Sequence, residues 1–213
     1  MRFSEDTPKP EEKTEEKERI IFAPPELKLR TVGVMGEIND DAGAETVFGL
    51  LSLHNSAVHY EPVDIEDEDS EMKEVIMPID MVISTPGGNV DDMFAIYDTM
   101  RSIRDEVPIR TRGIGKVMSA GVVLLAAGTK GERSIGKNCR IMLHSVIGGH
   151  VGPMHQLDNE MEEIRNIQDQ YISVLAEETK MTKRYLRSLL KKKVNIYLSA
   201  SEAVELGIAD KIF

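Results

Sequence analysis

Residues 79–103, IDMVISTPGGNVDDMFAIYDTMRSI, place a strand, a glycine turn and a helix in direct succession. The run 80–84 is compact and rich in apolar and β-branched residues, and the Pro86-Gly87-Gly88 sequence after it is a strong turn signal. Beyond the turn, apolar residues recur at the spacing of one helix face: Val90, Met93, Ile96, Tyr97 and Met100. A strand that leads at once into a helix is typical of an α/β fold.

The amino-terminal side begins with a charged segment. Residues 1–19 are rich in Glu, Lys and Pro and bury too little apolar surface to fold, so we expect a flexible tail. Residues 20–213 then form one domain. Within it, residues 20–22 and Thr31–Met35 predict strands, and residues 40–57 predict a helix that follows an aspartate cap.

The carboxyl side continues the alternation after a strongly acidic stretch at 61–74, for which we expect a solvated loop. A helix begins at Ser119, and Arg140–Leu143 predicts another strand, so the order indicates a mostly parallel sheet. Residues 154–179 predict one long helix with an apolar stripe: Met154, Leu157, Met161, Ile164, Tyr171 and Leu175. This stripe packs either within the chain or against a partner subunit.

Composition excludes several classes of function. The 213 residues carry a formal net charge of -11, which disfavours binding to nucleic acid because phosphate would be repelled. A single cysteine, Cys139, rules out an intrachain disulfide and fits a reducing compartment. No apolar run is long enough to span a bilayer. We therefore expect a cytoplasmic protein that does not enter a membrane.

Ser119 is a polar residue in the apolar run GKVMSAGVVLLAAG, residues 115–128. It stands where a helix begins, and the outward-pointing N–H groups of a helix N-terminus favour developing negative charge. Two interpretations are open at this point. The hydroxyl is a nucleophile, or it caps the helix and has no part in catalysis.

His144 is the natural base for such a serine, because it ends an apolar strand, where reacting groups gather in open α/β sheets. A structural role for a single strand-end histidine is the alternative. Strand alternation places Cys139 on the opposite side from His144, which indicates a buried apolar role for the thiol.

Spacing does not favour a metal site or a phosphate-binding loop, so we expect neither a metal nor a cofactor. The Gly87-Gly88 pair is better explained by a close approach of backbone. Without side chains, these amides can contact an extended peptide or a carbonyl oxygen. A simple tight turn is the alternative.

Three motifs together resemble those of the ClpP-type serine peptidases: STPGG at 84–88, GKVMSAGVVLLAAGTKGER at 115–133 and NCRIMLH at 138–144. The closing segment LSASEAVELGIADKI is similar too, so the resemblance covers residues 31–213. It implies a crotonase-like α/β fold with a protruding handle helix at 154–179. In that family, handles interleave to join two stacked heptameric rings around a chamber.

The resemblance also implies roles for individual residues. Ser119 matches the nucleophile and His144 the general base, while the amides of Gly88 and Ala120 match the oxyanion hole and Gly87 lies along the bound substrate. The implied activity is hydrolysis of peptide bonds in unfolded proteins or peptides. The implied partners are further copies of the chain and an AAA+ unfoldase.

The third member of the catalytic triad is where the sequence departs from the family pattern. Asn195 stands where an aspartate is expected. Its side-chain carbonyl can accept the Nδ1 proton of a histidine, but it lacks the charge that stabilises imidazolium. Asp210 is a candidate substitute.

The departures leave several alternatives. The chain is a weak or silent ring subunit, a phage head-maturation peptidase with a dedicated protein substrate, or an acyl-CoA enzyme of the crotonase-like architecture. Acyl-CoA chemistry does not need a serine and a histidine at these two positions.

Overall fold

The computed structural model describes residues 29–65, 67, 69–149, 151, 153–191 and 194–213. The predicted tail at 1–19 and the predicted strand at 20–22 lie outside these residues. The strands and helices follow one another in the order β1 Thr31–Met35, α1 Asp40–Asn55, β2 Val58–Pro62, β3 Met72–Ile76, β4 Ile79–Thr85, α2 Val90–Ile103, β5 Ile109–Met118, α3 Ala120–Ala126, β6 Ser134–Ile135, β7 Arg140–Leu143, α4 Met154–Glu178, α5 Lys183–Leu190, β8 Ile196–Leu198, α6 Ala200–Glu205 and β9 Lys211–Ile212.

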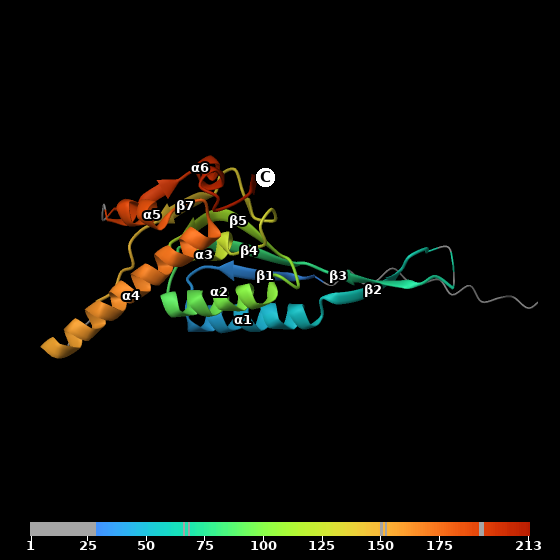
Figure 1. Ribbon diagram of the computed structural model, residues 1–213, viewed down its shortest axis with the longest axis horizontal. Helices are drawn as coiled ribbons and strands as arrows, with labels where there is room; N and C mark the ends of the chain where they lie inside the picture. Colours follow the sequence, from blue (N-terminus) through green and yellow to red (C-terminus); the bar gives the residue numbers. More distant parts are fainter. Residues whose placement is uncertain (1–28, 66, 68, 150, 152, 192–193) are drawn as a thin grey trace, which may run out of the picture.

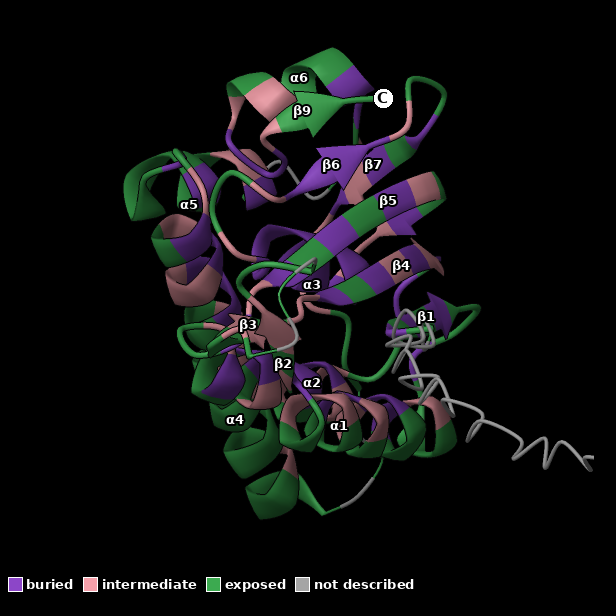
Figure 2. Cartoon of the chain, turned by 90° about the vertical axis from the view of Figure 1, so that its right-hand side faces the viewer, coloured by how far each residue is buried: buried purple, intermediate pink, exposed green. Residues whose placement is uncertain are grey.

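The central sheet is mostly parallel, which confirms the predicted α/β class. Its strands follow the order β1-β4-β5-β6-β9, and β7 pairs with both β5 and β8. All of these pairs are parallel except β7 with β8. Helices α1 and α2 lie side by side against one face of the sheet (Figures 1 and 2). The carboxyl ends of β4 and β5 therefore open toward the same edge.

Two helix starts show which residues fix the local structure. Helix α1 begins after Asn39, whose side chain accepts a hydrogen bond from the Ala42 N–H, so the predicted aspartate cap is wrong by one residue. Helix α2 is capped by Asn89 in the same way. Both caps satisfy N–H groups that have no partner inside the helix.

Helix α3 forms the centre of the core. All seven of its residues are buried, and it is packed against the strands that flank it. Gly121 allows this approach, because a Cβ at that position would collide with the Thr85 side chain in β4. The beginning of α3 is thereby held rigidly beside the end of β4.

The acidic stretch at 61–74 is a loop only in its middle. Its described residues between 63 and 71 have no regular secondary structure and are mostly exposed, as expected, whereas its two ends belong to an antiparallel hairpin in which β2 pairs with β3. The hairpin projects away from the sheet domain (Figure 1). The register places Val58 opposite Ile76, Tyr60 opposite Glu74 and Pro62 opposite Met72, so one face is mostly apolar but carries Glu74. The pairing of these two strands orders the ends of a stretch whose net charge alone predicted a loop.

Helix α4 has two halves with different surroundings. Its carboxyl half is packed in the core through Tyr171, Ile172 and Leu175. Its amino half extends beyond the sheet, at the end of the molecule opposite the hairpin (Figure 1), and exposes Met154 and Met161. Part of the stripe therefore packs within the chain, and Ile164 lies half-buried against Gly148, while Met154 and Met161 remain exposed.

Candidate active site

Ser119 occupies a sharp turn between the end of β5 and the start of α3. Its backbone has φ 53° and ψ −121°, and it is the only non-glycine residue with positive φ among those the structure describes. Its side chain makes no capping hydrogen bond, so the helix-cap interpretation is wrong. A strained backbone of this kind persists only where the surroundings enforce it, and it is typical of functional sites.

The surroundings that enforce this turn are contacts on both sides of the serine. The Ser119 N–H donates to the Met142 carbonyl of β7 across 2.8 Å. On the other side lies Gly87, where an added Cβ would stand only 2.6 Å from the Ser119 Cβ. The turn therefore needs glycine at position 87. Through this contact Ser119 packs directly against the strand–turn–helix motif of residues 79–103.

The glycine pair leaves one amide free. Gly87 and Gly88 have φ of 98° and 155°. The Gly87 N–H donates to Thr85 Oγ1 and its carbonyl accepts from the Ile38 N–H. The Gly88 N–H has no such partner within the described chain. Gly87 therefore contributes space, whereas Gly88 offers a donor.

A second free donor comes from the start of α3. Ala120 is the first residue of this helix, so its N–H has no partner inside the helix. Gly88, Ser119 and Ala120 line the same cavity of about 660 Å³. Two free amides thus lie around the cavity that holds the serine hydroxyl.

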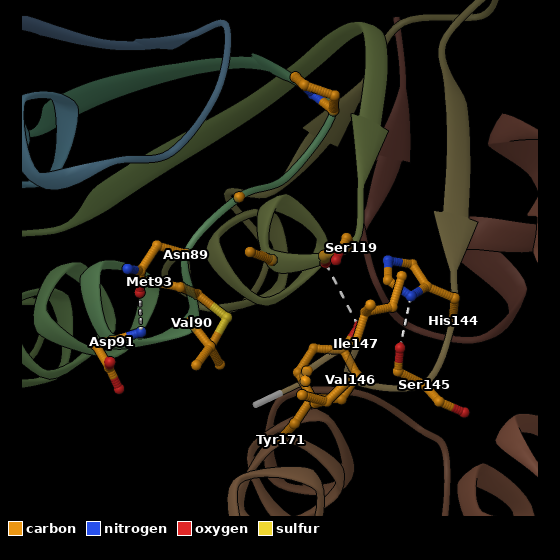
Figure 3. Close-up of a pocket in the computed structure, with 15 residues that line it drawn as sticks. Asn89, Val90, Asp91, Met93, Ser119, His144, Ser145, Val146, Ile147 and Tyr171 are labelled. Atoms are coloured by element: carbon orange, nitrogen blue, oxygen red, sulfur yellow. Dashed lines mark hydrogen bonds between the residues drawn. The ribbon is translucent and has the colours of Figure 1, made fainter. Parts of the chain in front are cut away.

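His144 lines this cavity as well, directly after β7 (Figure 3). It is half-buried, and its Nδ1 lies 2.6 Å from the Ser145 carbonyl oxygen. A carbonyl only accepts hydrogen bonds, so this contact assigns a proton to Nδ1, and in the neutral ring Nε2 then keeps its lone pair. No hydrogen bond joins Ser119 to His144 in the described part of the chain, although both face one cavity.

The comparison with known families agrees with this arrangement. The family model described as Clp protease matches residues 69–213, from the tip of the hairpin to the end of the chain. The chain belongs to the Clp protease family. The match includes the serine turn, the glycine pair and His144, and it supports the expected ClpP-like fold. The family assignment supports peptidase activity in general. It does not assign roles to single residues, which must be argued from the geometry of the site.

Asn195, the residue expected from the sequence to stand in place of the triad's aspartate, lies just before β8 and is exposed. It lines a second cavity, of about 360 Å³, together with His144 and Ser145. The fold thus brings the asparagine to the neighbourhood of the histidine. No hydrogen bond connects the two side chains among the described residues.

Asp210 does not replace the expected aspartate. Its carboxylate makes two hydrogen bonds with the Arg133 guanidinium and accepts a third from the Gly131 N–H. Burial raises its pKa, but these hydrogen bonds prevail and hold the pKa below its usual range. The Asp210 carboxylate therefore supports the β9 end of the sheet and is not part of either cavity around His144.

Cys139 is a buried apolar residue, as strand alternation predicted. It is almost fully enclosed, and burial raises the pKa of its thiol to about 11. A thiol with so high a pKa is a poor nucleophile at neutral pH.

Two residues of α4 touch the site and were not recognised as part of it from the sequence. Tyr171 lines the main cavity and donates from its phenol to the Ser119 carbonyl across 3.4 Å (Figure 3). Gln168 accepts a hydrogen bond from the Val146 N–H at 2.7 Å. Tyr171 was assigned only to the apolar stripe. No motif marked Gln168, since its partner is a backbone group distant in sequence.

Proposed function

We propose that this chain is a serine endopeptidase with Ser119 as nucleophile and His144 as general base. The observation that carries the proposal is the left-handed backbone of Ser119. It holds the hydroxyl in a cavity shared with the histidine and two free amides. A serine placed only for packing or capping would gain nothing from this strain.

The proposed reaction proceeds in two steps. Nε2 of His144 takes the hydroxyl proton while Oγ of Ser119 forms a bond to the peptide carbonyl carbon. The C–N bond then breaks, and the departing amine takes the proton from the histidine. Water, deprotonated by the same histidine, then attacks the acyl carbon. The bond to Ser119 Oγ breaks, the carboxylic acid leaves, and Oγ takes the proton back from the histidine. Both proton transfers need the lone pair of Nε2, which the Nδ1 contact with Ser145 leaves available.

The developing oxyanion is proposed to be held by the N–H groups of Gly88 and Ala120. Both amides are free of partners in the described chain, and Ala120 stands at the positive end of α3. Donors fixed in advance near developing charge are a large source of catalytic power. Gly87 is proposed to serve substrate binding indirectly, because its lack of a side chain lets Ser119 lie against the strand end that would face the bound peptide.

Asn195 is proposed as the third member of the site. It lines a cavity with His144, and its side-chain carbonyl accepts the Nδ1 proton when the ring leaves the Ser145 carbonyl. An amide lacks the negative charge of an aspartate, so the resulting peptidase is slower than one with a carboxylate here.

Assembly is proposed to follow the Clp protease family, whose members typically form oligomeric rings. The exposed amino half of α4 offers Met154 and Met161 for burial between subunits. We propose stacked heptameric rings that enclose the active sites, unfolded polypeptides as substrates, an AAA+ unfoldase as partner and the cytoplasm as location. No described helix is long and apolar enough to cross a membrane.

Labelling with a fluorophosphonate probe tests the nucleophile. Wild-type protein should be modified at one site, and Ser119→Ala should remove the label while leaving the circular dichroism spectrum unchanged. Gel filtration of the same sample should show an assembly well above 23.8 kDa. A label that persists in Ser119→Ala would refute the assignment.

The alternatives give different results in the same experiment. A silent ring subunit assembles but takes no label, and an acyl-CoA enzyme takes none either and instead binds coenzyme A thioesters. A head-maturation peptidase takes the label and cleaves one dedicated protein while leaving unfolded casein intact.

A further inference from the structure

The peptide group between Ser145 and Val146 links the histidine to helix α4. Its carbonyl accepts from Nδ1 of His144 at 2.6 Å, and its N–H donates to Oε1 of Gln168 at 2.7 Å. The two bonds use opposite ends of one planar amide. The orientation of the imidazole is therefore tied to the side chain of a residue 24 positions away.

From this chain of bonds we propose that Gln168 is a positioning residue for catalysis, which holds His144 in the tautomer that a general base needs. The inference rests on the proposed function, since it assigns Gln168 a role in the Ser119–His144 reaction. The family's acid normally orients the histidine. Here the backbone carbonyl of Ser145, fixed by Gln168, orients it in the resting site.

The Ser145–Val146 segment has no regular secondary structure that would fix it otherwise. It follows β7 as an irregular loop, so its peptide groups are free to rotate unless they are bonded. Besides Gln168, the anchors include Ser145 Oγ, which donates to the Leu190 carbonyl of α5, the Val146 side chain, which packs against the core, and Gly148, which lies close against Ile164 of α4. Of these contacts, only the Gln168 bond is a hydrogen bond to the peptide group that carries the acceptor.

The direction of the Gln168 amide follows from its partner. The Val146 N–H is a donor, so the oxygen and not the nitrogen of the amide must face it. Nε2 of Gln168 is buried and has no hydrogen-bond partner in the described part of the chain. The amide therefore serves the loop through its oxygen alone.

This asymmetry predicts which substitutions preserve the role. Gln168→Glu keeps an oxygen at the acceptor position. It loses no hydrogen bond, because Nε2 of Gln168 makes none within the described residues. Gln168→Met keeps the length and removes the acceptor, which leaves the half-buried Val146 N–H without its partner. A donor stranded in this way rotates or binds water, and the Ser145 carbonyl moves with it. The proton on Nδ1 then loses its preferred acceptor.

The test combines a kinetic and a spectroscopic measurement on the full-length protein. The rate of fluorophosphonate labelling should fall about tenfold in Gln168→Met and stay within about threefold of wild type in Gln168→Glu. Gln170→Met is the matched control, since Gln170 is an exposed residue of the same type on the same helix. It should label as wild type does.

The tautomer is read from the nitrogen signals of protein labelled with ¹⁵N-histidine, by solid-state magnetic resonance so that assembly size does not interfere. His144→Gln assigns the signal. Wild type and Gln168→Glu should show a protonated Nδ1 and a pyridine-like Nε2, and Gln168→Met should show a mixture. A purely structural role of Gln168 would lower the melting temperature and leave this ratio unchanged.

Several outcomes overturn the proposal. One is a wild-type His144 protonated mainly on Nε2, and another is a Gln168→Met protein whose tautomer ratio and labelling rate match those of Gln170→Met. If the Gln168→Met protein does not fold, the His144 tautomer in wild type and in Gln168→Glu still tests the proposal, because both should carry the proton on Nδ1. If wild type takes no label at Ser119, the proposed function fails, while the nitrogen signals still show whether Gln168 orients the ring.

Discussion

The Tyr171 hydroxyl donates to the carbonyl of Ser119 across 3.4 Å, and through this contact helix α4 touches the strained turn of the nucleophile. The same carbonyl also accepts from the Val122 N–H at 3.0 Å. Since α4 extends from this turn to the exposed amino half proposed for subunit contacts, one rigid helix joins the assembly surface to the reacting residue.

Tyr171→Phe should slow fluorophosphonate labelling of Ser119 by about two- to fivefold. The phenol bond is long and the ring itself is kept, so the expected loss of stability is below about 1 kcal/mol. The labelling rate and thermal unfolding check the two parts. Tyr185→Phe, at an exposed tyrosine of α5, is the control and should match wild type in both. A Tyr171→Phe protein that labels at the full rate would show that the contact has no catalytic effect.

Gly88→Ala should abolish labelling. A Cβ at this position would collide with the carbonyl oxygen of Ile38, and backbone cannot swing away as a side chain can. The free amide proposed for the oxyanion hole would be displaced. Gly131→Ala is the matched control, because Gly131 also has a positive φ, of 88°, but nothing within 4 Å of an added Cβ. It should cost about 1 kcal/mol of stability and leave labelling intact. Equal labelling of the two variants would argue against Gly88.

Glu178→Gln should destabilise the chain strongly. This carboxylate is only 1% exposed and contacts Arg104 at 3.0 Å, Lys130 at 2.8 Å and the Tyr97 hydroxyl at 3.1 Å. A neutral amide leaves Arg104, which is 10% exposed, without its counter-charge, whereas Lys130 is half exposed and stays solvated. The cost should therefore lie at the lower end for a broken buried pair, about 3 kcal/mol. The melting temperature should therefore drop by roughly 10 °C at equal protein concentration. The control Glu177→Gln, at an exposed surface pair, should change it little.

The same carboxylate predicts a loss of stability in acid. Burial raises the pKa of Glu178, but hydrogen bonds from Arg104 and Lys130 prevail and hold the pKa below the ordinary 4.5. A carboxyl whose pKa is lowered by folding stabilises the folded state above its unfolded-state pKa, and this stabilisation disappears as pH falls through the folded-state value. The difference between wild type and Glu178→Gln should be full at pH 7 and shrink below about pH 4.5 in denaturant titrations. A constant difference down to pH 3 would contradict this origin.

Asn195→Asp should raise the labelling rate of Ser119 by about tenfold or more, because a carboxylate near His144 stabilises the imidazolium that forms in the reaction. Asn195→Ala should slow labelling by about three- to tenfold, because the amide that accepts the Nδ1 proton during the reaction is lost while the Ser145 carbonyl still holds Nδ1 in the resting site. An unchanged rate in Asn195→Asp would show that missing charge does not limit the enzyme. An unchanged rate in Asn195→Ala would show that Asn195 takes no part in the reaction.

Local patterns determined much of this protein. The strand–turn–helix of residues 79–103, the strand before His144 and the helix over 154–179 were all predicted, because alternation and helical spacing reflect burial directly. The acidic stretch was predicted as a loop throughout, and its middle is one, but its charges concealed the ends of two strands that pair only with each other. Ser119 was placed at the right junction, but its hydroxyl was not separable from a helix cap until its backbone conformation was known.

The remaining features depend on tertiary contacts. These contacts join residues that are distant in sequence. They are the close packing of Ser119 against Gly87, the ion pair that holds Asp210 on Arg133, and the hydrogen bond from the Val146 N–H to Gln168. Periodicity reports which face of an element is buried, but not which backbone group a side chain reaches there. The amino-acid sequence thus predicted the family and the mostly parallel sheet, and it marked Ser119 and His144 as candidates for one site. Only the packing of α4 against the loop after β7 decided how that histidine is held.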